Sequence, residues 1–234
     1  MPTTLVFNDH FEIPFSVDSL DAFRAWMQGD EAPENGRVDY LSGRIEVDMS
    51  PEELFTHGKP KVELSAVLGM LLKRIRTGHL FCNSTRMANA VAGLSAEPDL
   101  VFVSHAALDA GSVRLVPKAS GAAEQFVELE GSPDMVCEIV SDSSVAKDKQ
   151  RLPICYFAAG VREFWLLDAR GQSLEFVIHR RGVSDFQPAA IDESGFQHSE
   201  VFATSFRLDR QCDERGHWEY DLRIQNETPQ SECR

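Results

Sequence analysis

Two segments of the sequence combine a Pro-Asp pair with a run of apolar residues, "EPDLVFVS" at 97–104 and "SPDMVCEIVSD" at 132–142. Both runs are typical of buried strands, and the second has a glutamate, Glu138, in its middle. A carboxylate within a buried strand is costly unless it is paired or binds a cation. The sequence therefore predicts either a bound cation or a basic side chain beside Glu138, and a cap is the alternative for Asp99.

A second carboxylate is expected to lie close to the first. Side chains two residues apart on a strand share a face, so Asp134, Val136, Glu138 and Val140 point the same way. Asp99 begins the earlier strand, and if the two strands are neighbours, Asp99 and Glu138 converge. Two carboxylates this close repel each other unless a cation lies between them. Oxygen ligands favour Mg²⁺ or Mn²⁺, which activate a bound water and stabilise charge on a phosphoryl oxygen.

The pattern resembles a known signature. Asp99 after Pro98, with Glu138 on a later strand, looks like the PD-(D/E)XK nuclease motif. "EPDLVFVS", "GSPDMVCEIVSDSS" and "YFAAGVREFWLLDAR", with "MSP" at 49–51, are together similar to the Uma2 family of restriction-endonuclease-like proteins over about residues 37–180.

The resemblance implies a restriction-endonuclease-like core with Asp99 and Glu138 as ligands of Mg²⁺ or Mn²⁺. It implies DNA as the partner, cleaved by hydrolysis of phosphodiester bonds with a metal-activated water. It also implies that Asp134 is a cap or supporting residue and not the signature aspartate.

The chain departs from the superfamily pattern at Val140, because the pattern places a lysine two residues after the glutamate. The following helix, predicted over 143–158, offers Lys147 and Lys149. One face of it repeats at spacings of four, three and four residues: Val145, Lys149, Leu152 and Tyr156. We expect that face to point inward, which favours Lys149 as the basic residue that assists the water. Lys147 would lie on a neighbouring face that could meet phosphate.

Upstream, His57 is a further candidate catalytic residue. It lies seven residues before Leu64, near the apolar stripe of the helix predicted to follow, and the family often has a histidine in this region. A histidine of the core or of the helix start is the alternative for His57. Glu46 and Glu63 are expected to be solvated.

The charge balance argues against strong DNA binding, since nucleic-acid binders usually show a basic footprint. The net charge is −14, but the acidity lies in the flanks: residues 1–53 hold 12 acidic and 3 basic side chains, and residues 54–184 hold 14 and 15. Two alternatives therefore stay open beside the endonuclease: a nuclease-fold binding or regulatory module without catalysis, and a hydrolase of small phosphoesters.

The elements expected around the site alternate between strands and helices. A helix is predicted over 18–28, a hairpin over 37–49 turning near Ser42–Gly43, and a helix beginning at Ser50–Pro51 that either kinks or restarts at Pro60. Strands are predicted at 97–104, 126–131, 134–141 and 163–168, with further β-structure in the C-terminal part. The expected class is α/β, a mixed sheet flanked by helices with extra C-terminal strands, forming one domain over 1–234.

Bulk features predict a cytoplasmic protein without a membrane span. The N-terminal residues lack a basic start followed by a long apolar run, and the five cysteines are scattered without a CxxC pair. Because cleavage of both strands of a duplex requires two sites, a symmetric homodimer is also predicted.

Overall fold

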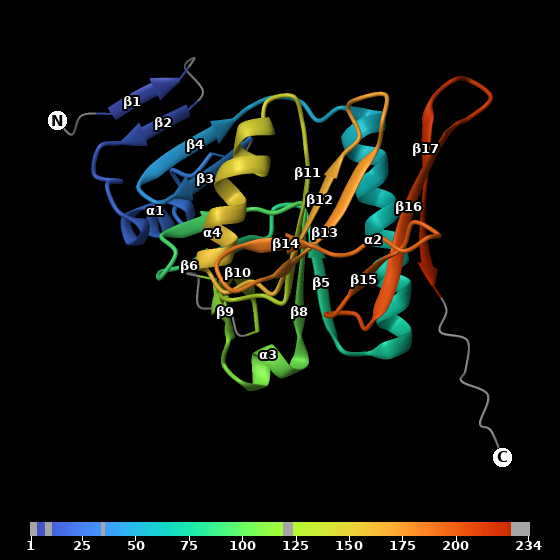
Figure 1. Ribbon diagram of the computed structural model, residues 1–234. Helices are drawn as coiled ribbons and strands as arrows, with labels where there is room; N and C mark the ends of the chain where they lie inside the picture. The colour runs from blue at the N-terminus through green and yellow to red at the C-terminus, as the bar shows by residue number, and fades with distance from the viewer. Residues whose placement is uncertain (1–3, 8–10, 34–35, 119–123, 226–234) are drawn as a thin grey trace.

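The computed structural model describes residues 4–7, 11–33, 36–118 and 124–225 (Figure 1). One six-stranded sheet has the order β14-β13-β12-β11-β8-β5, with β11 and β12 parallel and the other pairs antiparallel. Its strands are Phe186–Pro188, Glu175–Arg181, Glu163–Asp168, Met135–Ile139, Leu100–Ser104 and Gly78–Cys82. This mixed sheet contains both strands on which the carboxylates were predicted.

A second six-stranded sheet has the order β4-β3-β7-β6-β10-β9. Its strands are Arg44–Asp48, Arg37–Leu41, Leu94–Ala96, Arg86–Asn89, Phe126–Gly131 and Val113–Pro117. Two smaller sheets pair β1 (Thr4–Phe7) with β2 (Phe11–Pro14) and join β15 (Gln197–Ser199), β16 (Thr204–Cys212) and β17 (Trp218–Gln225).

The helices are α1 (Leu20–Met27), α2 (Lys59–Ile75), α3 (His105–Asp109) and α4 (Leu152–Ala158). Two π-helical turns, η1 (Leu54–Gly58) and η2 (Lys147–Arg151), lead directly into α2 and α4. Among the described helices, none combines the length and the apolar character that crossing a bilayer requires.

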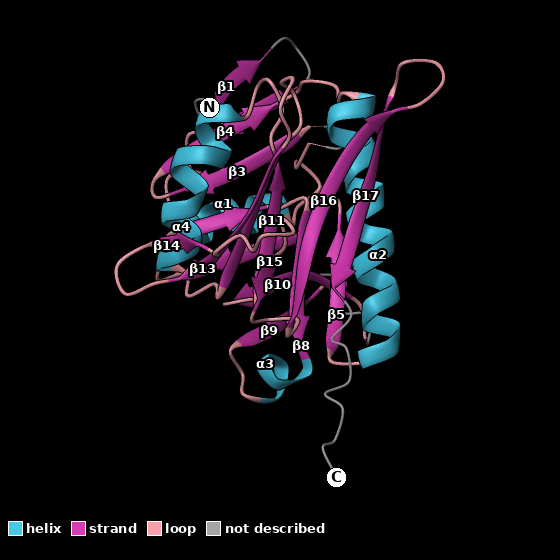
Figure 2. Ribbon diagram, turned by 45° about the vertical axis from the view of Figure 1, so that its right-hand side comes forward, coloured by secondary structure: helices cyan, strands magenta, loops and turns pink. Residues whose placement is uncertain are grey.

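Alternate residues of β11 face different helices, as the period of a strand requires. Cys137 belongs to the core cluster that contains Leu64 and Leu68 of α2, whereas Val136 belongs to the cluster that contains Leu152 of α4. The C-terminal strands β16 and β17 run beside α2 (Figure 2). The side chain of Glu138 therefore lies on the α4 side of the sheet.

The predicted fold class is confirmed: the protein is mixed α/β, with mixed sheets flanked by helices and additional C-terminal strands. The hairpin at 37–49 is formed by β3 and β4. The helix expected at 18–28 is α1, and Ser19 caps it by accepting a hydrogen bond from the Ala22 backbone N–H.

Two helix predictions are wrong, and both concern the π-helical turns. The helix expected from Ser50 begins only at Leu54, because the Glu53 carboxylate accepts the backbone N–H groups of Phe55 and Thr56 and takes the capping role. The predicted restart is confirmed, since α2 begins at Lys59.

The second concerns the helix predicted over 143–158, which is present and ends at Ala158 before Gly160 as expected; the error is the regular α-helical spacing assumed along it. In η2 the Leu152 backbone N–H bonds to the carbonyl of Lys147, five residues earlier, instead of four. Because this turn contains one extra residue, the side chains that precede Leu152 are rotated about the helix axis relative to the side chains of α4. The face defined by Leu152 and Tyr156 is therefore continued by Lys147 and Asp148, both buried, and not by Lys149.

Candidate metal centre

Asp99 and Glu138 lie beside each other, as predicted from the two strands. Strand β8 pairs antiparallel with β11, with Leu100 opposite Cys137. One residue beyond this ladder, Asp99 Oδ2 accepts the backbone N–H of Ile139 at 2.8 Å. Both carboxylates are buried, with Asp99 0 % and Glu138 1 % exposed.

Asp99 is surrounded by basic side chains. Its Oδ1 lies 2.9 Å from Arg37 Nη2 and 3.1 Å from Lys61 Nζ, and its Oδ2 lies 3.4 Å from His57 Nε2. Burial alone would raise the pKa of Asp99, but the hydrogen bond from His57 and the charges of Arg37 and Lys61 outweigh burial and hold this pKa well below its usual range. Asp99 is therefore an ionised, compensated carboxylate.

Glu138 has the opposite environment. The Tyr156 hydroxyl donates to Glu138 Oε1, but within the described part of the chain the buried Oε2 has no hydrogen-bond partner. Burial, followed by the charges of Asp148 and Asp99, raises the pKa of Glu138 well above its usual value. A buried carboxylate without compensation is costly, so this position favours a proton or a cation.

Asp148, which the sequence analysis did not identify, repeats this pattern. It comes from η2, is 1 % exposed, and accepts a hydrogen bond from Ser144 at Oδ2 while its buried Oδ1 has no partner. Burial is the main cause that raises the pKa of Asp148, to about 6. Glu138 and Asp148 thus each present an unpartnered oxygen on the α4 side of the site.

These donors fit a hard divalent cation. Glu138 Oε2 and Asp148 Oδ1 are buried oxygens that lack partners, and carboxylate oxygens are the ligands that Mg²⁺ and Mn²⁺ prefer. Among the described residues, the group whose ligand atoms lie within 4.8 Å of one another, and so within reach of one ion, is a second set: Glu52, His57 and Asp99. Asp99 belongs to this second set, and its charge acts on both Glu138 and Asp148 of the first.

The two lysines of η2 are placed differently from the prediction. Lys149 Nζ lies 2.7 Å from Asp168 Oδ2 and 2.7 Å from Glu175 Oε2 at a partly exposed site, so its expected inward orientation is wrong. The physical reason is the rotation introduced by the π-helical turn. Lys147 is instead buried, with its Nζ 2.7 Å from Asp39 Oδ2.

Lys147 faces the carboxylates of the centre. Burial would lower the pKa of Lys147, but the charges of Asp39, Glu138 and Asp148 raise it above its usual value. The residue expected to contact phosphate from a neighbouring face is therefore a buried cation within the charge network of Glu138.

His57 lies where the sequence placed it, near the start of the long helix and on its inner side. It is 3 % exposed and lies between Asp99 and Glu52, with Nδ1 3.5 Å from Glu52 Oε2. The sequence offered a route to the unpredicted Lys61. His57, Lys61, Leu64 and Leu68 follow spacings of four, three and four, so Lys61 lies on the inner stripe of α2.

The remaining candidate carboxylates serve the scaffold. Asp134 lies at the far end of β8 from Asp99, where it accepts the Ser104 backbone N–H at 2.7 Å and pairs with Arg162. Glu46 and Glu63 are not merely solvated as expected. Glu46 pairs with Arg151, and Glu63 accepts the Leu222 backbone N–H.

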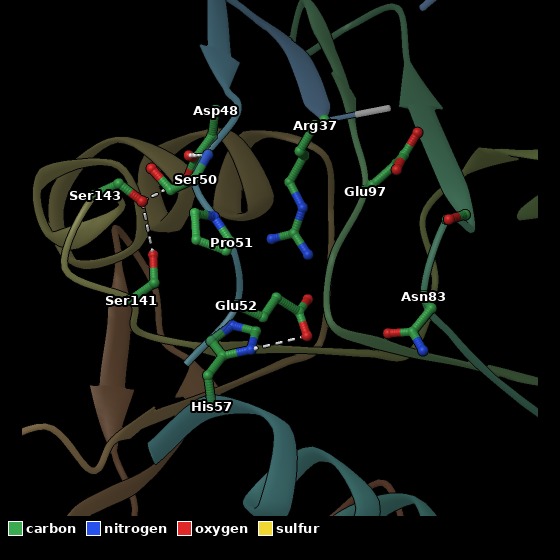
Figure 3. A pocket seen from close by; sticks show the side chains of 12 residues that line it. Arg37, Asp48, Ser50, Pro51, Glu52, His57, Asn83, Glu97, Ser141 and Ser143 are labelled. Atoms are coloured by element: carbon green, nitrogen blue, oxygen red, sulfur yellow. Dashed lines mark hydrogen bonds and ion pairs between the residues drawn. The ribbon is translucent and has the colours of Figure 1, made fainter. Parts of the chain in front are cut away.

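A polar cleft of about 370 Å³ opens next to the centre. Arg37, Glu52 and His57 line it, with Ser141 and Ser143 toward one side and Asn83 and Glu97 toward the other (Figure 3). Asp99 and Glu138 lie behind the lining residues, and Arg37 and His57 reach from Asp99 to the cleft wall. A molecule in the cleft would therefore meet Arg37, Glu52 and His57 first.

The buried acids predict a pH dependence of stability without metal. The folded protein holds the Asp148 proton up to about pH 6, whereas the ordinary pKa is 3.8. Since the unfolded chain loses this proton first, the free energy of unfolding should fall by on the order of 2 kcal/mol as pH rises from about 4 to about 6. Glu138 acts in the same direction.

Urea denaturation in EDTA across this pH range checks the prediction. Asp148→Asn should flatten the slope, and saturating Mn²⁺ should do the same in the wild type. A stability that instead rises between pH 4 and 6 would contradict it.

Comparisons with known proteins bear on the same region. Residues 20–211 match the model of the Uma2 family, described as "Putative restriction endonuclease". The chain is also similar to the crystal structure of a putative nuclease belonging to DUF820 from Anabaena variabilis ATCC 29413. That similarity has 18% identity and a TM-score of 0.57, and covers 79% of this chain and 90% of the other, so it shows a shared fold. No curated protein matches the chain.

Proposed function

This chain belongs to the Uma2 family of putative restriction endonucleases, and from that premise we propose that it is a metal-dependent DNA endonuclease. One observation carries the proposal: two buried carboxylates, Glu138 and Asp148, keep unpartnered oxygen atoms beside the ionised Asp99. Structural acids normally find partners when they are buried. A cation bound by the unpartnered oxygens of Glu138 and Asp148 would offset the free-energy cost of burying these two acids.

In this proposal Asp99, Glu138 and Asp148 hold Mg²⁺ or Mn²⁺. When bound, such an ion lowers the pKa of a water and stabilises charge on a phosphoryl oxygen. Arg37 forms an ion pair with Asp99 and also lines the cleft. The N–H groups of Arg37 that do not contact Asp99 can therefore bind a phosphate in the cleft. His57, between Glu52 and Asp99, is placed to accept or donate a proton at the cleft wall.

Lys147, and not Lys149, is the basic residue of η2 that this proposal places in catalysis. Lys147→Met should lower the cleavage rate by about 10² or more, because it removes a buried cation whose charge stabilises the ionised forms of Glu138 and Asp148. Lys149→Met should change the rate less than about twofold, since among the described residues Lys149 pairs with Asp168 and Glu175 alone.

Single-turnover cleavage by the two variants compares them directly, with metal affinity measured on the same samples. Equal losses in both variants, or a loss in Lys149→Met alone, would refute the assignment.

DNA as the substrate and a symmetric homodimer as the active form complete the proposal. Cleaving both strands of a duplex requires two such centres, which two copies of the chain would supply. Lys73, Arg74 and Arg76 at the end of α2 make no ion pair among the described residues and are available to phosphate. Contacts between these basic groups and phosphates would release counterions, so an affinity that falls with salt is the expected signature.

Plasmid nicking with Mg²⁺ or Mn²⁺, against EDTA, tests the function. Nicking that requires the metal supports the endonuclease, whereas cleavage of bis(p-nitrophenyl) phosphate without any effect on DNA would favour the small-phosphoester hydrolase. The competing regulatory module is favoured by one observation, the three basic groups that already surround Asp99. It predicts no cleavage with either substrate.

A further inference from the structure

The oxygens of Asp99 are fully used by the protein itself. Oδ1 meets Arg37 and Lys61, and Oδ2 meets the Ile139 backbone N–H and His57. A carboxylate offers about four lone-pair sites, so none is left over. A metal ion that binds Asp99 must therefore take the place of one of these four contacts.

Three of the four contacts are poorly suited to leave. The Ile139 N–H is part of β11 and is fixed by the sheet. Among the described residues, Arg37 forms its ion pair with Asp99 alone, so leaving Asp99 would cost Arg37 its partner. A neutral imidazole is itself a metal ligand, so His57 can stay beside a bound ion.

Lys61 has an alternative partner. Its Nζ lies 2.6 Å from Glu52 Oε1, closer than its 3.1 Å from Asp99 Oδ1. The Glu52 side chain is 53% exposed, whereas the Lys61 side chain is 7% exposed. The flexible four-carbon side chain of Lys61 allows its ammonium group to move away from Asp99 while it keeps its ion pair with Glu52.

Building on the proposed metal dependence, we infer that Lys61 is the resident cation of Asp99, which a divalent metal displaces toward Glu52. Lys61 then lowers the metal affinity of the centre by competing with the ion for Asp99, and Glu52 assists metal binding by accepting the displaced ammonium group. In the metal-free protein, Lys61 compensates the charge of Asp99 and so helps the protein to stay folded.

Calorimetric titration of Mn²⁺ into the folded full-length protein provides the test, with no dependence on activity. Lys61→Met should bind Mn²⁺ about tenfold to a hundredfold more tightly than the wild type, since a charged hydrogen bond no longer competes. Lys61→Gln serves as the second variant if the methionine does not fold. Lys59→Met, which removes an exposed lysine paired with Glu219, is the matched control and should leave the affinity within twofold.

A double-mutant cycle separates the role of Glu52 from that of a metal ligand. Glu52→Gln should weaken Mn²⁺ binding in the wild-type background and leave it unchanged in the Lys61→Met background. Equal weakening in both backgrounds would overturn the receiving role, because it would make Glu52 a ligand.

The outcomes also separate this inference from the proposed function. Wild-type binding that Lys61→Met does not tighten would overturn the inference and leave the metal dependence standing. An absence of binding in the wild type and in every variant would overturn both. Binding that appears only when Lys61 is removed would support the inference and identify the native chain as the regulatory module.

Discussion

Asp99→Asn should lower the free energy of unfolding by about 3–5 kcal/mol at neutral pH in EDTA, and should abolish divalent-metal binding. The substitution keeps the shape of the side chain but removes the charge that compensates Arg37 and Lys61. Breaking a buried ion pair by removing one partner leaves an uncompensated buried charge, which accounts for the magnitude.

Urea denaturation of the variant and the wild type measures this loss. Asp134→Asn is the control, because Asp134 lies at the other end of β8 and pairs with the half-exposed Arg162. It should cost about 1–2 kcal/mol and leave metal binding intact. A loss below 1 kcal/mol for Asp99→Asn would show that the surrounding cations do not depend on Asp99.

The pH dependence of this effect has a definite sign. The pKa of Asp99 is depressed in the folded protein, so its contribution is present above the ordinary aspartate pKa and is lost as pH falls. The difference between the wild type and Asp99→Asn should therefore shrink below about pH 4.

Glu138→Gln should act in the opposite direction on stability while also abolishing metal binding. Without metal, the variant should be more stable than the wild type by about 1–3 kcal/mol at neutral pH, because burial and the charges of Asp148 and Asp99 disfavour the charged form of Glu138 more than Lys147 and Arg37 favour it. The amide oxygen of glutamine can still accept the hydrogen bond from Tyr156.

A second buried glutamate provides a matched control. Glu163 is also 1 % exposed, but its two oxygens accept hydrogen bonds from Trp165, Ser199 and the backbone N–H groups of Glu200 and Val201. Glu163→Gln should therefore destabilise the protein by about 1–3 kcal/mol. If Glu138→Gln destabilised the protein as much, Glu138 would be an ordinary structural acid.

Asp99 and Glu138 have opposite electrostatic surroundings, so the two sides of the centre differ. The Asp99 side is compensated by basic groups from β3, η1 and α2, whereas on the other side Glu138 and Asp148 each keep one oxygen without a hydrogen-bond partner among the described residues, and burial raises their pKa values. A cation gains most where the acids lack compensation, on the α4 side of the sheet. The acids that the proposed function needs for metal binding therefore lower the stability of the metal-free protein.

The sequence was informative where short-range rules apply. Strand alternation predicted that Asp99 and Glu138 converge if their two strands are neighbours, and the β8–β11 register shows that they are. The family resemblance, stated for residues 37–180, is confirmed over the longer range 20–211.

The basic side of the site was not predictable in the same way. Arg37 and Asp39 come from the second sheet, and their approach to Asp99 and Lys147 depends on how the two sheets meet. The choice between Lys147 and Lys149 depends on a single i→i+5 hydrogen bond, which helical periodicity does not anticipate. Only Lys61 left a signal, its place on the inner stripe of α2.

The central claim is that Asp99 and Glu138 together hold a divalent cation. Calorimetric titration of Mg²⁺ and Mn²⁺ into the wild type, Asp99→Asn and Glu138→Gln tests it most directly, with Glu163→Gln as the folded control. The account predicts binding to the wild type and the control, and none to the other two variants. Binding that persists in Glu138→Gln with the wild-type affinity would contradict it.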